Sequence, residues 1–256
     1  MDFTGDFTIT TFLIFIGVGF LAQMIDGALG MAYGVSSNTF LLSVGVPPAV
    51  ASACVHLAEV VTTGISGITH WKLGNVDKET FKKLIIPGVL GGIAGAYLLT
   101  SIDGNVIKPW ISGYLMIMGF VILWRALKKN GKEGRVITWI TPLGLIGGFM
   151  DAIGGGGWGP VVTTTLMARG NNPRFSIGSV NSSEFFVTFA ESVTFLLTLG
   201  GLFQNWPIIV GLLIGGGLAA PLAAFATKRL PTKFLMGLVG ILIIALSLRT
   251  LISILL

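Results

Sequence analysis

Long apolar stretches alternate with short polar ones along nearly the whole chain. A helix needs roughly 20 apolar residues to cross the hydrocarbon core of a membrane, which is about 30 Å thick. Ten apolar segments can be marked, of which the second and seventh are short and rich in Gly, Ser and Thr. Their approximate limits are 8–25, 28–45, 48–70, 84–101, 107–126, 136–151, 157–168, 174–200, 206–226 and 233–255. We therefore predict an all-α polytopic membrane protein with no separate soluble domain.

The composition supports a lipid environment. Of the 256 residues, 53% are apolar, 11% are charged and 37 are glycine. A soluble domain carries about 25% charged residues, so this chain holds too little polar sequence to cover a water-soluble globule. The single cysteine, Cys54, excludes an internal disulfide, and the chain lacks the material expected for redox chemistry or a zinc site.

The basic residues predict which side of the membrane each loop occupies. The net charge is +5, and fourteen of the sixteen Lys and Arg residues follow odd-numbered segments. These fourteen are Lys72, Lys78, Lys82, Lys83, Arg125, Lys128, Lys129, Lys132, Arg135, Arg169, Arg174, Lys228, Arg229 and Lys233. Because short loops rich in Lys and Arg face the cytoplasm, we expect a multi-pass protein of the plasma (inner) membrane with both termini outside. The same placement explains the basic balance without a nucleic-acid partner.

The chain contains an internal repeat at an offset of 125 residues. The aligned identities include Asp26 with Asp151, Gly30 with Gly155, Gly34 with Gly159, Pro48 with Pro173 and Glu59 with Glu184. Each copy holds five segments, and an odd number forces the two copies to enter the membrane in opposite senses. We therefore predict two inverted-topology repeats, residues 1–127 and 136–256, joined by a basic cytoplasmic linker at 128–135. Transporters of this design bind substrate near the membrane midplane, where the repeats meet.

Each repeat carries an Asp-led, Gly-rich stretch that an unbroken helix is not expected to cross. These stretches read DGALGMAYG over 26–34 and DAIGGGGWG over 151–159. Backbone N–H groups freed there, beside a helix N-terminus, suit an anion, although small residues also serve close helix packing. The candidate substrate-binding residues are Gly30, Tyr33, Gly34, Ser36, Asn38, Gly155, Gly156, Gly157, Trp158, Gly159, Thr163, Asn181 and Ser182.

Two geometries of the broken segments remain open. Segments one and two, and likewise six and seven, either cross the membrane fully or form a hairpin that turns at mid-membrane. Segment seven has about twelve residues, or 18 Å at 1.5 Å per residue, which favours the hairpin. Tyr33 and Trp158 either wall the pocket or serve packing.

Ionisable residues inside apolar segments are the candidates for coupling. A charged group within a span is costly and is a functional candidate by default. The candidates for binding a proton or another coupling ion are Glu59, Glu184, His56, Asp26 and Asp151. The alternatives are carboxyls that only tie helices together and, for the two aspartates, helix-end capping. Glu191 has no carboxylate counterpart, so a functional and a structural role both stay open for it. His56 aligns with Asn181, so a duplicated metal site is not supported, and we expect neither a metal nor a cofactor.

Together these features resemble the sulfite exporter (TauE/SafE) family of membrane permeases. The resemblance rests on the Asp-led Gly-rich segment, Pro47–Pro48, Ala51–Ser52–Ala53 and Glu59, with the pattern repeated from Asp151 to Glu184. It implies export of small sulfur-containing anions such as sulfite, sulfoacetate or other organosulfonates. A dianion leaving a cell that is negative inside gains roughly 4.6 kcal/mol per 100 mV, so export does not require a coupling ion.

The leading hypothesis is thus a secondary transporter that exports a small anion by alternating access, with a proton or sodium ion as the optional coupling ion. One alternative is an anion channel or facilitator whose broken segments form the selectivity filter. Another is an intramembrane enzyme, against which no Gly-x-Ser-x-Gly or paired-histidine motif is present. We expect no enzymatic activity, and the sequence leaves a monomer and a homo-oligomer both open.

Overall fold

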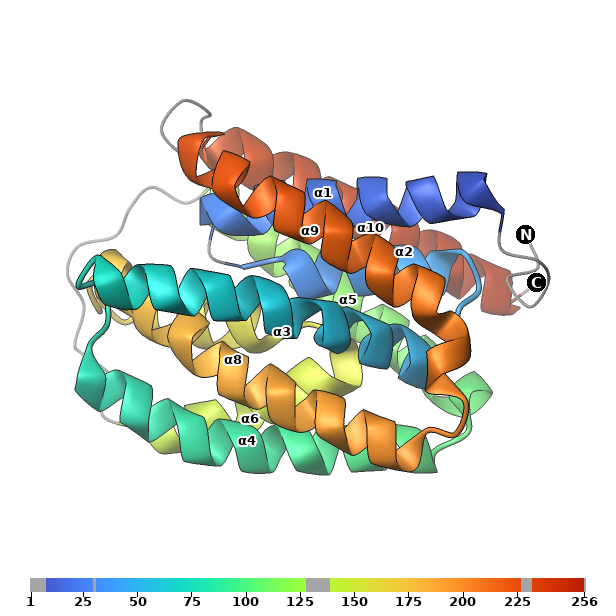
Figure 1. Ribbon diagram of the computed structural model, residues 1–256, viewed down its shortest axis with the longest axis horizontal. Helices are drawn as coiled ribbons and strands as arrows, with labels where there is room; N and C mark the ends of the chain where they lie inside the picture. The colour runs from blue at the N-terminus through green and yellow to red at the C-terminus, as the bar shows by residue number, and fades with distance from the viewer. Residues whose placement is uncertain (1–7, 30, 128–138, 227–231, 256) are drawn as a thin grey trace.

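The structure, a computed structural model, describes residues 8–29, 31–127, 139–226 and 232–255. All regular secondary structure in these ranges is helical (Figure 1). The helices are α1 (Ile9–Leu29), α2 (Tyr33–Ser43), α3 (Pro48–Lys72), α4 (Lys78–Ser101), α5 (Gly104–Leu127), α6 (Ile140–Gly154), η1 (Gly159–Thr163), α7 (Thr164–Ala168), α8 (Pro173–Thr198), η2 (Leu202–Asn205), α9 (Trp206–Ala226) and α10 (Thr232–Leu255). Each predicted apolar segment coincides with one of these helices, with η1 and α7 together forming the seventh. The predicted all-α polytopic membrane fold is confirmed.

Six of the described helices are long and apolar enough to span a membrane: α1, α3, α4, α5, α9 and α10. The 25 residues of α3 extend about 38 Å at 1.5 Å per residue, more than the roughly 30 Å of hydrocarbon. By contrast, α2 has 11 residues and reaches only about 16 Å. The second and seventh segments are short, as predicted, and α2 begins near the middle of the molecule (Figure 1).

The long helices pack in pairs that join the two halves of the chain. The most extensive contacts are those of α1 with α9, α4 with α6, α5 with α10, and α3 with α8. If each helix of α1–α5 is exchanged with its counterpart in α6–α10, the α1–α9 pair becomes the α6–α4 pair and the reverse. The α5–α10 and α3–α8 pairs stay the same under this exchange. This is the contact pattern of two halves that exchange with each other. The repeat and its boundaries at 127 and 136 stay predictions, and the linker 128–135 lies outside the described residues.

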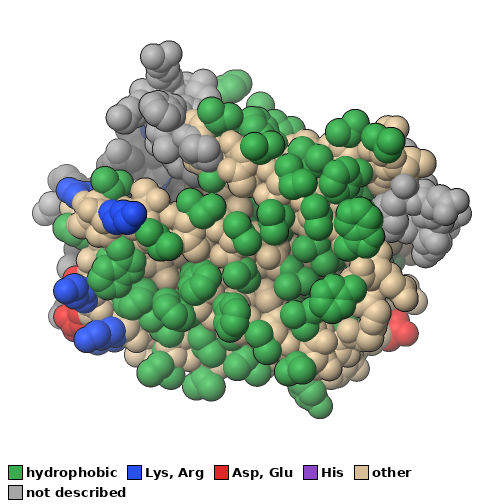
Figure 2. Space-filling view, in the orientation of Figure 1, with side chains coloured by type: hydrophobic (Ala, Val, Ile, Leu, Met, Phe, Trp, Pro, Cys, Tyr) green, Lys and Arg blue, Asp and Glu red, His purple; other side chains and the backbone are tan. Residues whose placement is uncertain are grey.

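The surface and the interior have the polarity expected of a protein in lipid. Large apolar side chains lie outward, for example Ile86, 69% exposed, and Tyr97, 64% exposed, on α4. Figure 2 shows hydrophobic side chains spread across one face, with the basic side chains of that face near one end. The interior instead holds buried His56, Glu59 and Glu191. Polar groups that avoid lipid have therefore gathered between the helices.

Connections of the two halves meet at one end of the molecule. Arg174, at the start of α8, donates from Nε to Asn75 Oδ1 at 2.5 Å and from Nη2 to the Leu73 carbonyl at 3.0 Å, both in the α3–α4 connection. The start of α1 and the end of α10 lie at the opposite end (Figure 1). Lys128, Lys129, Lys132, Arg135, Lys228 and Arg229 lie outside the described residues, so the sidedness of the loops stays a prediction.

Candidate functional site

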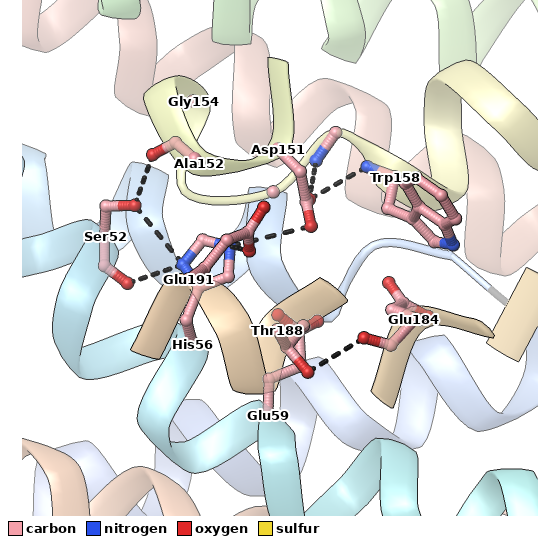
Figure 3. Close-up of polar contacts among 12 residues, drawn as sticks. Ser52, His56, Glu59, Asp151, Ala152, Gly154, Trp158, Glu184, Thr188 and Glu191 are labelled. Carbon is pink, nitrogen blue, oxygen red and sulfur yellow. Dashed lines mark hydrogen bonds and ion pairs between the residues drawn. The ribbon is translucent and has the colours of Figure 1, made fainter. Parts of the chain in front are cut away.

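In each half of the chain, the helix is interrupted in the Gly-rich stretch, which we call the break. An aspartate accepts hydrogen bonds from backbone N–H groups on the far side of each break. Asp151 Oδ1 accepts hydrogen bonds from the backbone N–H of Gly157 at 2.6 Å and of Trp158 at 2.8 Å (Figure 3). In the first half, Asp26 Oδ1 accepts from the Tyr33 N–H at 3.3 Å. The acceptor and the aromatic donor are seven residues apart in both halves. This geometry is that of helix-end capping, one of the two roles considered for these aspartates.

The two breaks are in contact with each other, and the contact is between backbone atoms of glycine residues. A Cβ built on Gly34 would lie 2.7 Å from Gly156 Cα and 2.9 Å from the Gly155 carbonyl oxygen. Gly155 has φ +62° and Gly156 φ +147°, values that side chains rarely tolerate. In the first half, Ala32 takes φ +110° without being glycine, a strained conformation of the kind that concentrates at functional sites. The structure thus brings together Gly34, Gly155 and Gly156 from the predicted set.

Asn38 also links the halves at this junction. Its side-chain Nδ2 donates to the Gly154 carbonyl at 2.5 Å, across from α2 to the end of α6. Gly155 lies against the Asn38 side chain, Gly157 donates its N–H to Asp151 Oδ1, and Gly159 begins η1. η1 is a π-helical turn, a feature frequent at functional sites. Gly30 lies outside the described residues.

The two aromatic residues of the breaks are buried and paired. The Tyr33 hydroxyl donates to the Leu212 carbonyl of α9 at 3.1 Å, and Trp158 Nε1 donates to the Val180 carbonyl of α8 at 3.2 Å. Trp158 also lies against Gly88 of α4, where a Cβ would come 2.5 Å from its ring. Both rings therefore fasten a break to neighbouring helices, in agreement with the packing interpretation.

Trp158→Phe is expected to lower the free energy of unfolding by about 1 to 3 kcal/mol. The change removes a buried hydrogen bond worth about 0.5–1.5 kcal/mol and leaves a small cavity. Thermal unfolding of the purified protein in detergent measures the loss. Trp110→Phe, at a site 77% exposed on α5, is the control and should shift stability by less than about 0.5 kcal/mol. Equal shifts in the two variants would contradict this role of Trp158.

Several buried polar atoms of α2, η1 and α8 have no hydrogen-bond partner among the described residues. They are Ser36 Oγ, Ser37 Oγ, Asn38 Oδ1, Thr163 Oγ1 and Asn181 Oδ1. Four of these residues belong to the predicted substrate-binding set, and Ser37 is their neighbour. Because an unpaired buried polar group costs free energy, these atoms are available to a polar ligand or to water.

Asn181 and Ser182 make their inter-helix contacts with α3. Asn181 Nδ2 lies 3.3 Å from Ser66 Oγ, and the Ser182 hydroxyl donates to the Gly67 carbonyl at 3.4 Å and within its own helix to Gly178 at 2.7 Å. These bonds join the two central helices α3 and α8. The two residues therefore stabilise the helix crossing, and only the Asn181 carbonyl oxygen stays unpartnered.

Three of the five predicted coupling residues lie on α3 and α8, whereas Asp26 lies on α1 and Asp151 on α6. Glu59 and His56 come from α3 and Glu184 from α8, and all three are at least nine-tenths buried (Figure 3). Glu59 Oε2 has no hydrogen-bond partner among the described residues. Carboxyl groups so placed can take up a proton or a cation, or serve as acceptors, inside the protein.

His56 lies beside Asp151, which belongs to the predicted coupling set, and beside Glu191, which does not. Its Nε2 lies 2.8 Å from Glu191 Oε2 and 3.6 Å from Asp151 Oδ2, and its Nδ1 lies 2.7 Å from the Ser52 carbonyl (Figure 3). The three side chains form the one described group able to hold a metal ion. Glu191 was left aside because its repeat counterpart is Ser66. Its position seven residues after Glu184, two helical turns along the same face, was the available signal.

Comparisons with known proteins agree with this architecture. A family model described as "Sulfite exporter TauE/SafE" matches residues 15–250. The "Probable membrane transporter protein YtnM" of Bacillus subtilis (strain 168) is 46% identical over 250 residues, covering 94% of this chain and 83% of that protein. The "Probable membrane transporter protein ORF9" of Sinorhizobium sp is 26% identical over 249 residues, covering 91% of this chain and 89% of that protein.

No solved structure matches this chain. The family match extends over nearly all the described helices, and the YtnM match covers most of both proteins. The chain therefore belongs to the sulfite exporter TauE/SafE family and is a multi-pass membrane transporter.

Proposed function

We propose that this transporter exports a small sulfur-containing anion, such as sulfite, sulfoacetate or another organosulfonate, by alternating access. The observation that carries the proposal is the junction of the two Gly-rich breaks, where Gly34 of one half touches Gly155 and Gly156 of the other. A site at the meeting point of two halves is exposed to either side when one half rocks against the other. The choice of a sulfur oxyanion follows from the family and not from a contact in this chain.

The polar lining of the junction suits an oxyanion. The unpartnered hydroxyls of Ser36 and Thr163 can donate to oxygens of a sulfite or sulfonate group. Arg125, from α5, reaches toward both short segments, with Nη1 3.3 Å from Met31 Sδ and Nη2 2.7 Å from Met167 Sδ. Thioether sulfurs are weak acceptors, so the guanidinium keeps positive charge beside the path. We place the basic loops on the cytoplasmic side of the plasma (inner) membrane, where they would attract the anion.

A transport panel tests the substrate class and the mode of transport. The full chain is reconstituted in liposomes and assayed with sulfite, sulfoacetate and thiosulfate, with and without proton or sodium gradients. Saturable transport with counterflow of labelled substrate is the expected result and identifies a carrier. Transport that neither saturates nor shows counterflow identifies a channel, and transport of none of the three anions overturns the proposed substrate class. A chemically altered product would overturn transport as the sole activity.

We further propose that Glu59 and Glu184 bind the coupling ion. Glu59→Gln and Glu184→Gln are each expected to reduce gradient-driven transport at least about tenfold, or 1.4 kcal/mol in barrier height, since an amide cannot exchange a proton or supply a negative charge. Initial rates across a pH series in proteoliposomes measure the effect. Glu79→Gln is the control because Glu79 is exposed and pairs with Lys83 in the first turn of α4. Unchanged rates and pH profiles in both buried variants would remove these residues from the mechanism.

A further inference from the structure

We propose that His56, Asp151 and Glu191 bind one divalent transition-metal ion of the Zn²⁺ type inside the helix bundle. The site adjoins the proposed anion site, since Asp151 also accepts hydrogen bonds from Gly157 and Trp158 of the break, but it does not depend on the identity of the substrate. Its three ligands come from α3, α6 and α8, so the ion would tie together helices from both halves of the chain.

The distances between the three side chains suit a shared ion. One ligand atom from each residue lies within 4.8 Å of the other two. His56 Nε2 is 2.8 Å from Glu191 Oε2 and 3.6 Å from Asp151 Oδ2. Ligands at about 2.0–2.2 Å from a tetrahedral Zn²⁺ are roughly 3.4 Å apart. Small side-chain rotations therefore suffice to enclose the ion.

Hydrogen bonds around the cluster hold the ligand atoms in the orientation that a metal needs. His56 Nδ1 lies 2.7 Å from the Ser52 carbonyl, which can only accept, so Nδ1 carries a proton and Nε2 faces the carboxylates. Asp151 Oδ1 is occupied by two backbone N–H groups, which leaves Oδ2 directed at His56. In metal sites, a ligating histidine usually donates its other ring N–H to a carbonyl or carboxylate, and a ligating carboxylate is usually hydrogen-bonded as well. The Ser52 carbonyl and the two backbone N–H groups are partners of this kind.

The cluster lacks other partners within the described residues. No hydrogen bond reaches Asp151 Oδ2 or either carboxylate oxygen of Glu191, and both side chains are at least 98% buried. With Nδ1 protonated, a neutral imidazole would place a lone pair 2.8 Å from a carboxylate oxygen. A cation or a second proton must therefore lie between Nε2 and Oε2.

Charge balance favours the divalent cation over the second proton. An imidazolium beside two carboxylates leaves one uncompensated negative charge in the protein interior, which is costly. A divalent ion with a neutral imidazole and two carboxylates has no net charge. One nitrogen and two carboxylate ligands suit Zn²⁺ and neighbouring transition metals, whereas Mg²⁺ and Ca²⁺ prefer oxygen alone.

In the other half, the counterpart of Asp151 is again an aspartate, Asp26, but the His56–Glu191 pair has no ionisable counterpart. The repeat counterparts of His56 and Glu191 are Asn181 and Ser66, which contact each other at 3.3 Å. At that position, the contact between α3 and α8 is therefore formed by a neutral amide and a hydroxyl. Packing of α3 on α8 does not require the charged pair, so a ligand-binding role accounts for it. Gly92 of α4 leaves space for the Glu191 side chain, since a Cβ at Gly92 would lie 2.5 Å from Glu191 Oε1.

Metal analysis of the purified full chain tests the proposal without any transport assay. The protein is purified in detergent without a metal-affinity step, loaded with Zn²⁺, desalted and analysed by mass spectrometry. About one zinc per chain is expected. Replacement by Co²⁺ should give visible d–d absorption, because imidazole and carboxylate ligands lower the coordination symmetry. Bound zinc well below one per chain, together with a Co²⁺ spectrum identical to that of the free ion, would show that a proton occupies the cluster and would overturn the site.

Three variants and a matched control locate the ion. His56→Gln, Asp151→Asn and Glu191→Gln should each weaken Zn²⁺ binding at least about tenfold, since each removes a ligand. Asp151→Asn keeps an Oδ1 acceptor for the Gly157 and Trp158 N–H groups, so the loop stays capped. Glu79→Gln, at an exposed carboxylate that pairs with Lys83, should leave zinc binding unchanged. Wild-type affinity in the three variants, or an equal loss in Glu79→Gln, would contradict the assigned ligands. If a variant does not fold, the Co²⁺ spectrum of the unaltered protein still decides.

Discussion

Gly156→Ala is expected to lower the free energy of unfolding by about 2 to 6 kcal/mol, the sum of backbone strain and overpacking of about 1–3 kcal/mol each. Gly156 takes φ +147°, which an alanine adopts only with strain. Its Cβ would also collide with the Val35 nitrogen and the Gly34 carbonyl carbon, and would lie 2.7 Å from Gly34 Cα. Backbone atoms held in the facing break cannot rotate away as a side chain can, so the two breaks must separate.

The effect is measured by detergent-solubilised yield, gel-filtration profile and thermal unfolding. Gly17→Ala is the matched control because a Cβ at Gly17, in the middle of α1, meets no atom within 4 Å. Alanine there should be neutral or stabilising by up to about 1 kcal/mol through its higher helix propensity. If Gly156→Ala unfolds at the same temperature as Gly17→Ala, the breaks do not touch as described.

Asp151→Ala is expected to lower the free energy of unfolding by about 2 to 6 kcal/mol. The substitution leaves the buried N–H groups of Gly157 and Trp158 without their acceptor, at about 1–3 kcal/mol each. Asp26→Ala removes a single longer bond to Tyr33 at a half-buried position, and should cost about 0.5–1.5 kcal/mol. Thermal unfolding of the two variants side by side measures the difference between the repeat counterparts.

The amide variant separates capping from charge. Asp151→Asn retains an oxygen that accepts from both N–H groups, so it should keep most of the stability that Asp151→Ala loses. The comparison is made in metal-free buffer with a chelator, so that loss of a bound ion does not contribute. Equal destabilisation by Asn and Ala would show that the carboxylate charge, and not the two hydrogen bonds, stabilises the break.

Much of the architecture could be predicted from local sequence. Apolar segments of about 20 residues predict spanning helices because an exposed backbone polar group is not tolerated in lipid. The short second and seventh segments were recognisable from their glycines, and both proved to be short helices next to a break. The carboxylates Glu59 and Glu184 were recognisable as unusual because charged groups within a span are costly, and both are buried in the structure.

The cluster of His56, Asp151 and Glu191 was harder to predict because its members share no local pattern. The repeat alignment directed attention to duplicated residues, and the His56–Glu191 pair is not duplicated. Asn181 and Ser182 were expected at the substrate site, yet their inter-helix contacts are with Ser66 and Gly67. Which residues of α3 and α8 face one another depends on how two helices from different halves cross, and this is not encoded by periodicity within either helix.

By itself, the sequence determined that this protein lies in a membrane, that it is built of helices, and where two of its segments break. These properties follow from the length of apolar runs and from glycine, proline and aspartate within a few residues of one another. Only the tertiary structure decided that the two breaks touch at Gly34 and Gly156, and that His56 meets Asp151 and Glu191. Such contacts join residues about a hundred positions apart, and the packing of whole helices, not local chemistry, sets their distances.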